Sequence, residues 1–126
     1  MPVFTDAEVE FMRTVRLLAR IATVGPDGMP HVTPVGWSLD DDATVIIVRG
    51  RDFAGTKKFR DVTRHGLAAI VIDEVLPPWR PRGIEVRGRA EAIGDDDPRI
   101  VIHPRRIISW GLEGAPGSAR TVGEAH

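Results

Sequence analysis

Hydrophobic and polar residues alternate with a period of two along much of this chain. The clearest case spans residues 84–93, where Ile84, Val86 and Ala90 would face one side of a strand and charged residues the other. Similar short segments recur at regular spacing, separated by turns rich in Gly, Pro or Asp. They predict strands at 18–24, 31–39, 43–49, 67–75, 84–93 and 99–111, the last bent at Pro104 into one strand or two.

Helical patterns are confined to two short segments. One helix is predicted to begin at Thr5, whose spacing to Glu8 fits a capping box. A second, amphipathic helix is predicted between Thr56 as N-cap and Gly66 as C-terminal stop. Many short strands with only small helices indicate a mainly β fold, an antiparallel barrel of six to seven strands.

Two segments show neither pattern. Residues 76–83 contain three prolines, which remove backbone donors, so no regular structure is expected there. Residues 113–126 are small, polar and rich in Gly, which predicts a flexible C-terminal tail. The length of 126 residues suits a single domain, which we expect to span residues 1–112.

Composition narrows the functions that this fold could perform. The net charge is −1, so nothing global attracts nucleic acid or an anionic membrane. There is no Cys for a disulfide, a thiolate zinc site or a nucleophile. His31 and His103 each stand alone without a metal-binding spacing, so no metal site is expected. No apolar run reaches the roughly 20 residues of a membrane span and no signal peptide is visible, so we expect a cytoplasmic protein.

The two lysines of the chain, Lys57 and Lys58, lie side by side after Thr56, whereas the other basic residues are all arginines. They would occupy the first turn of the second helix, where free N–H groups and the helix dipole attract anions. Arg51 lies in the loop before it. A pair of lysines can also be an ordinary solvated helix face, but the combination favours a phosphate-binding site. A P-loop is excluded, because its GxxxxGK[ST] motif is absent.

Three tryptophans, Trp37, Trp79 and Trp110, are the largest aromatic side chains, and the chain has no Tyr. A tryptophan in this context can fill a core or an interface, or it can form the wall of a site for a flat ring. Both interpretations stay open from the sequence.

The segments "RIATVGPDGMPHVTPVGW", "GTKKFRDVTRHG", "IEVRGRAEAI" and "IHPRRIISWGL" occur in this order between residues 5 and 112. In order and spacing they resemble the pyridoxamine 5′-phosphate oxidase-like family, the FMN-binding split-barrel flavoproteins. The likeness is greatest to its actinobacterial branch, which uses the deazaflavin coenzyme F420. Within that branch, "TKKFRD" and "HPRRIISWG" resemble a subgroup that includes a reductase of tetracycline-type biosynthesis.

The resemblance implies a split β-barrel that forms a homodimer with the cofactor at its interface. It implies that Lys57 and Lys58 hold the cofactor phosphate and that the strands before them carry the ring. This chain has Asp61 and Gly66 where the family usually has Asn and Pro, and little effect on the chemistry is expected. The predicted cofactor-binding residues are Val35, Gly36, Trp37, Val48, Arg49, Gly50, Arg51, Thr56, Lys57, Lys58, Trp79 and Trp110.

The function implied by this resemblance is an F420H2-dependent oxidoreductase. It would transfer hydride from the reduced deazaflavin to an electron-poor C=C or C=N bond of a small organic substrate. No catalytic side chain is expected, because the cofactor performs the chemistry. Two alternatives stay open: an FMN-binding oxidoreductase, and a non-catalytic protein that binds a flavin or haem.

Overall fold

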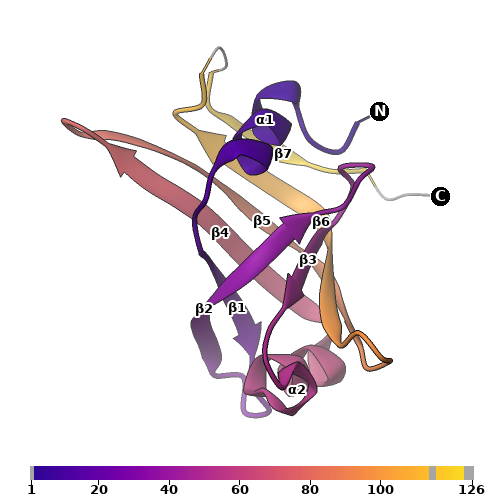
Figure 1. Cartoon of the computed structure of the whole chain (residues 1–126). Helices are drawn as coiled ribbons and strands as arrows, with labels where there is room; N and C mark the ends of the chain where they lie inside the picture. The colour runs from indigo at the N-terminus through magenta and orange to yellow at the C-terminus, as the bar shows by residue number, and fades with distance from the viewer. Residues whose placement is uncertain (1, 114–115, 124–126) are drawn as a thin grey trace.

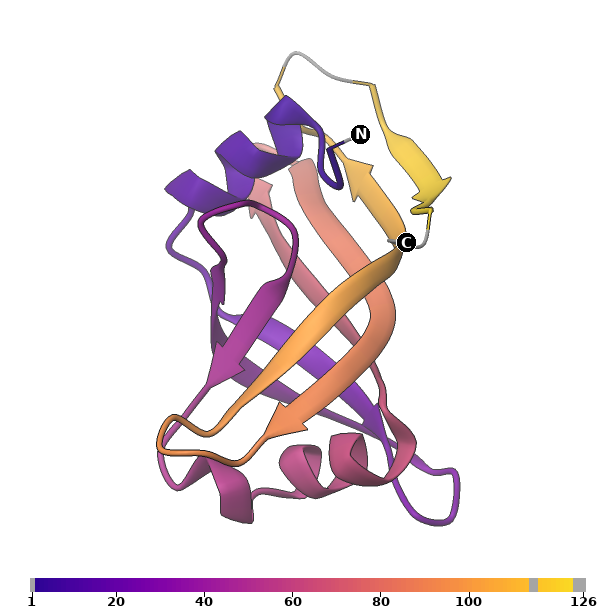
Figure 2. The ribbon, with the colours of Figure 1, turned by 90° about the vertical axis from the view of Figure 1, so that its right-hand side faces the viewer.

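The computed structural model describes residues 2–113 and 116–123. It forms an antiparallel barrel with a short helix near each end (Figures 1 and 2). The elements are α1 (Asp6–Thr14), β1 (Ala19–Val24), β2 (Pro30–Leu39), β3 (Ile46–Arg49), the 3-10 helix η1 (Phe53–Gly55), α2 (Lys57–His65), β4 (Leu67–Leu76), β5 (Arg80–Ile93), β6 (Arg99–Trp110) and β7 (Ser118–Thr121).

The strands are hydrogen-bonded in the order β3-β2-β1-β4-β5-β6-β7, and every pairing is antiparallel. A further pairing between β3 and β6, in which Ile46 lies opposite Ile102, closes six strands into a barrel. β7 lies outside this closed set, along β6. The predicted fold class, a mainly β antiparallel barrel with short helices, is confirmed.

Branched aliphatic side chains fill the barrel. Successive residues of a strand face opposite sides, so every second residue points inward. The largest fully buried hydrophobic side chains are those of Ile21, Ile46, Val48, Val62, Ile70, Ile72, Ile84, Val86, Ile100, Ile102 and Ile107. A small barrel packed in this way has no interior space for a planar cofactor, so a ligand must bind on an outer face or at an end.

Both helices have the caps that the sequence predicts. The Thr5 hydroxyl accepts a hydrogen bond from the Glu8 backbone N–H (3.2 Å), and the Glu8 carboxylate accepts one from the Thr5 N–H (2.9 Å). Thr56 caps α2, and Gly66 ends it with φ of 68°, a left-handed conformation that favours glycine.

Among the described residues, no helix is long and apolar enough to cross a membrane.

β6 is a single strand, one of the two alternatives predicted, with an irregularity in its pairing next to Pro104. Its pairing with β5 shifts register between Arg87 and Gly88, which leaves Arg105 as a β-bulge. The backbones approach so closely here that a Cβ atom at position 88 would collide with the carbonyl of His103. Glycine is therefore required at this position.

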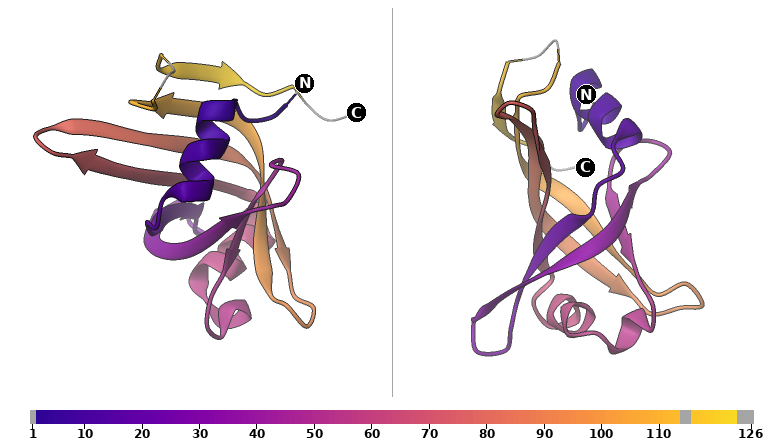
Figure 3. Two further views of the ribbon diagram at one scale, coloured as in Figure 1. Left: turned by 45° about the horizontal axis from the view of Figure 1, so that its top comes forward. Right: turned by 60° about the vertical axis from the view of Figure 1, so that its left-hand side comes forward.

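The prediction that residues 76–83 lack regular structure is wrong for most of the segment. β4 continues to Leu76 and β5 begins at Arg80, opposite it, so the two strands form a long hairpin that projects from the barrel (Figure 3). Pro81 pairs with Val75, and β6 joins β5 only from Gly83 onward. The missing N–H of Pro81 can therefore face the open edge, where proline is tolerated.

The prediction of a loose tail from residue 113 onward is wrong for residues 118–121, which form β7. Arg120 on this strand donates to the buried Glu8 carboxylate of α1 (Nη1 to Oε2, 2.9 Å) and to the carbonyl of Val3 (3.0 Å). β7 is thus fixed by ladder hydrogen bonds and an ion pair, neither of which needs an apolar pattern. Residues 114, 115 and 124–126 of the predicted tail lie outside the described residues.

Candidate cofactor-binding site

The predicted phosphate site lies at the start of α2, which covers the end of the barrel opposite α1 (Figure 2). The hydroxyl of Thr56 caps the helix: its Oγ1 accepts a hydrogen bond from the Phe59 N–H (3.4 Å) and donates one to the Phe53 carbonyl (2.7 Å). The backbone N–H groups of Lys57 and Lys58 make no hydrogen bond within the described residues. The helix start therefore offers an anion two free donors and a partial positive charge.

The two lysines differ in what they contact. The Lys57 ammonium lies 3.1 Å from both carboxylate oxygens of Asp61, one helical turn further along α2. Lys58 instead places its ammonium over the ring of Phe53, 5.4 Å from the ring centre. No carboxylate of the described residues lies within ion-pairing distance of Lys58. Lys57 is thus already neutralised, and Lys58 is the cation that can meet a ligand.

Asp61 is buried, with 1% of its surface exposed. Besides Lys57, its carboxylate accepts a hydrogen bond from the hydroxyl of Thr23 on β1 (2.8 Å), and Arg64 lies 3.7 Å away. Burial acts to raise the pKa of Asp61, but the hydrogen bonds from Thr23 and Lys57 outweigh it and hold that pKa below its usual value. The carboxylate is therefore charged at neutral pH.

The donors at this end of the barrel fit a phosphate group. Lys58, the free N–H groups of the first turn of α2 and the exposed Arg51 in the loop before it are all donors. Phosphate oxygens accept charge-assisted hydrogen bonds from ammonium and guanidinium groups. On this donor set, α2 can hold the phosphate of a flavin-like cofactor.

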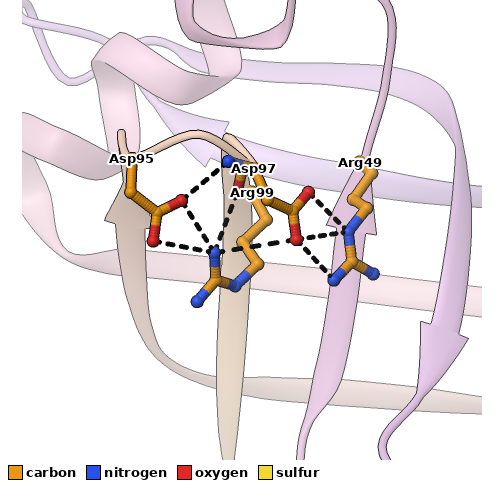
Figure 4. Close-up of polar contacts among 4 residues, drawn as sticks. All are labelled: Arg49, Asp95, Asp97 and Arg99. Atoms are coloured by element: carbon orange, nitrogen blue, oxygen red, sulfur yellow. Dashed lines mark hydrogen bonds and ion pairs between the residues drawn. The ribbon is translucent and has the colours of Figure 1, made fainter.

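Arg49, at the end of β3, forms an ion pair with the β5–β6 loop and not with the other phosphate-site residues. Figure 4 shows its guanidinium against Asp97 in the β5–β6 loop, with Nε–Oδ1 and Nη2–Oδ2 distances of 2.9 Å each. Arg99 joins the same group, 3.1 Å from Asp95 and 3.8 Å from Asp97. The side chain of Arg49 therefore anchors the β5–β6 loop beside the loop that leads to α2. Its contact with a cofactor stays a prediction.

Other predicted ring contacts on β2 and β3 mostly face the barrel interior. Val35 and Val48 are core residues. Trp37 packs against the core and donates from Nε1 to the carbonyl of Leu17 (2.8 Å). Gly36 is exposed, and Gly50 lies against the Phe53 ring. A ring could meet Val35 and Val48 only through their backbone, and these contacts stay predictions.

Trp79 and Trp110 lie far from the lysines within one chain. Trp79, 75% exposed, is at the tip of the β4–β5 hairpin, and Trp110 ends β6 against Gly83. Figures 1 and 3 place this hairpin at the end of the barrel away from α2. One chain therefore brings together the residues around α2 and leaves these two tryptophans apart from them.

An apolar surface covers the outer faces of β2, β1 and β4. Val32, Ala22 and Ala69 lie side by side across these strands, and Val32 and Leu67 are exposed. A cleft of about 360 Å³ crosses this surface, lined by Ala22, Thr23, Val24, Pro30, Leu67, Ala68, Ala69, Arg87, Gly88 and Arg105. Apolar patches of this kind mark surfaces that bind a partner or a ligand.

Asp61 is the residue that the sequence left out of the site. Its spacing of four residues from Lys57 is one that favours an ion pair on a helix. Its burial and its bond to Thr23, 38 residues away along the chain, depend on how α2 packs against β1. That contact carries no local sequence signal.

The chain matches a known protein family over most of its length. Residues 4–111 match the family described as Pyridoxamine 5′-phosphate oxidase. The chain belongs to this family of split-barrel proteins, and the resemblance seen in its sequence is confirmed.

One relative in particular covers nearly the whole chain. It is the 5a,11a-dehydrotetracycline/5a,11a-dehydrooxytetracycline reductase of Streptomyces rimosus, 36% identical over an alignment of 122 positions that covers 88% of this chain and 85% of the relative. A conserved hypothetical protein of Mycobacterium tuberculosis has a TM-score of 0.72 at 20% identity, covering 98% of this chain and 94% of that one. A protein named F420 Reductase has a TM-score of 0.61 at 21% identity, covering 78% and 94%. At these identities the two structures confirm the fold alone.

Proposed function

We propose that this protein is a reductase that uses the reduced deazaflavin coenzyme F420H2. It would transfer hydride to an electron-poor C=C or C=N bond of a small organic substrate. The main support is the 36% identity, over nearly the whole chain, to a relative named as a reductase of a dehydro compound. When bound, reduced F420 would supply the hydride, while the protein binds and orients the reactants and excludes water.

The coenzyme phosphate would lie at the first turn of α2. Lys58 and the free N–H groups of Lys57 and Lys58 would donate to its oxygens, and Arg51 would approach from the preceding loop. The phosphate of F420 is a diester with one negative charge. One free ammonium at a helix N-terminus is a suitable counterpart to it.

Beyond its phosphate, F420 continues into a lactyl-polyglutamate tail, which needs an open exit. A cleft of about 380 Å³ on the outer side of α2 is lined by Ala54, Phe59, Arg60, Thr63 and Arg64. Its two arginines are exposed and could meet carboxylates of the tail. FMN ends at its phosphate and has no group to place there.

The proposal includes a homodimer in which a second copy covers the apolar surface of β2, β1 and β4. The packed barrel interior excludes the coenzyme ring, so the ring must lie in an outer groove that needs a cover. A second copy would bury Val32 and Leu67 and shield the hydride from water. In such a shared site, Trp79 and Trp110 of the second copy could approach a coenzyme that Lys58 of the first copy holds.

Binding of candidate cofactors tests the proposal and its alternatives. The purified protein would be titrated in one buffer with F420 and FMN, followed by their fluorescence, and with haem, followed by its absorbance. We expect F420 to bind most tightly and F420H2 to be oxidised when a dehydro substrate is added. Tighter binding of FMN, or its copurification as a stoichiometric yellow cofactor, would favour the FMN oxidoreductase, and preferential haem binding would favour a carrier. A cytoplasmic location stays a prediction.

A further inference from the structure

Asp61 places a negative charge directly behind the phosphate-binding turn of α2. Its carboxylate is buried and fixed from two sides, by the Thr23 hydroxyl at 2.8 Å and by the Lys57 ammonium at 3.1 Å. Because water does not reach it, its charge is weakly screened. It therefore acts on any anion bound at the first turn of the helix.

The charge available to a ligand follows from these contacts. Asp61 pairs with Lys57 at 3.1 Å and also has Arg64 at 3.7 Å, which leaves Lys58 as the one lysine of the pair without an acidic partner among the described residues. Removal of the Asp61 charge alone would release both Lys57 and Arg64, and would double the positive charge that the two lysines present.

We propose that Asp61 is a specificity-determining residue, which favours a singly charged phosphodiester over a doubly charged terminal phosphate. This inference rests on the proposed function, because it concerns the same phosphate site. A terminal phosphate has a second pKa near 6 and carries about −1.5 to −2 at pH 7, whereas a diester carries one charge. With Asp61 charged, the first turn of α2 presents one unpaired ammonium and Arg51 lies in the preceding loop, so the second charge of FMN gains less than it would if Lys57 were also free.

The mutation Asp61→Asn tests the inference with little change of shape, since the asparagine oxygen can still accept from Thr23. Binding of F420 and FMN to wild type and variant would be followed by coenzyme fluorescence, with thermal melting as a check of folding. We expect the ratio of FMN affinity to F420 affinity to rise about tenfold, as one added charge at short range in a partly desolvated site would produce. Asp42→Asn is the matched control, because Asp42 is an exposed carboxylate in the β2–β3 loop, which Arg13 of α1 holds at the opposite end of the barrel.

A double variant shows whether Asp61 acts through Lys57. Lys57→Met with Asp61→Asn removes both charges of the pair, so the charge of the site is as in wild type. We expect its affinities for F420 and FMN to lie within about threefold of wild type, a difference of under 1 kcal/mol. This variant also keeps the inference testable if Asp61→Asn alone does not fold, since a larger loss of F420 affinity would then overturn it.

The outcomes separate this inference from the proposed function. If wild type prefers F420 and Asp61→Asn leaves the preference unchanged, the role of Asp61 is refuted while the proposed function stands. If the double variant keeps the raised preference for FMN, Asp61 does not act through Lys57 and the inference is wrong. If wild type binds neither coenzyme, the proposed function fails and the inference fails with it.

Discussion

Glu8 in the first helix is held by Arg120 in the last strand, 112 residues away along the chain. The Glu8 carboxylate is almost fully buried, and Ser109 on β6 also donates to it (2.7 Å). One carboxylate therefore joins α1, β6 and β7 at the end of the barrel opposite the proposed phosphate site.

We predict that Glu8→Gln and Arg120→Leu each lower the free energy of unfolding by about 2–3 kcal/mol, because each leaves a buried group without its charged partner. Urea denaturation would measure the loss. The double variant should be less destabilised than the sum of the two single variants, and simple additivity would contradict a direct coupling.

The same carboxylate predicts a pH dependence. Burial acts to raise the pKa of Glu8, but the hydrogen bonds from Arg120, Ser109 and Thr5 outweigh it, and the pKa lies below its usual value. A carboxyl group with a lowered pKa in the folded state stabilises the protein above its unfolded pKa, near 4.3. This stabilisation is lost as pH falls through the folded pKa. Melting curves at descending pH should show a smaller loss below pH 4 for Glu8→Gln than for wild type.

Lys58→Ala should weaken F420 binding about tenfold, the effect of losing one charge-assisted hydrogen bond, with little change in melting temperature. Lys57→Ala should lower the melting temperature clearly, because it leaves the buried carboxylate of Asp61 without its ammonium. Fluorescence titration and thermal melting of both variants would measure the two effects. Equal F420 affinity of wild type and Lys58→Ala would refute the phosphate site.

Shortening the polyglutamate tail of F420 should weaken binding moderately and more at low salt than at high salt, because exposed charge pairs are screened. Titration of tail-shortened coenzyme at two salt concentrations would measure this. In an Arg60→Gln/Arg64→Gln variant, tail length should no longer matter. A tail effect that survives in this variant would place the tail elsewhere.

Val32→Glu should convert the proposed homodimer into monomers, because it puts a charge at the centre of the apolar surface of β2, β1 and β4. The side chain is 64% exposed in one chain, so the monomer should keep its fold. Sedimentation at micromolar concentration would measure the mass. Ala119→Glu on the exposed side of β7 is the matched control and should leave the mass unchanged.

Structural features whose signal lies within a few neighbouring residues could be predicted from the sequence, and features that join distant segments could not. Alternation of branched residues is a property of each strand alone, and the cap of α2 at Thr56 lies within one turn, so both were predictable. The strand that contains Pro81 was not predicted, because a proline is tolerated there only on an open edge, and that edge depends on where β6 begins. β7 was missed because it is held by Arg120 and backbone pairing, which leave no apolar period. At the site, the lysine pair was visible, but the contacts Asp61–Thr23 and Arg49–Asp97 join distant segments.

The barrel is closed by strands that are synthesised far apart, since Ile46 of β3 pairs with Ile102 of β6. Contacts between residues far apart in sequence form late, because the chain between them must first be brought together. As the ribosome extends the chain, α2 can dock onto β1 once residue 65 has emerged, but β3 keeps an unpaired edge until β6 follows. The nascent protein thus holds a nearly finished phosphate site on an open sheet, and this exposed edge is where a chaperone would act or aggregation would begin.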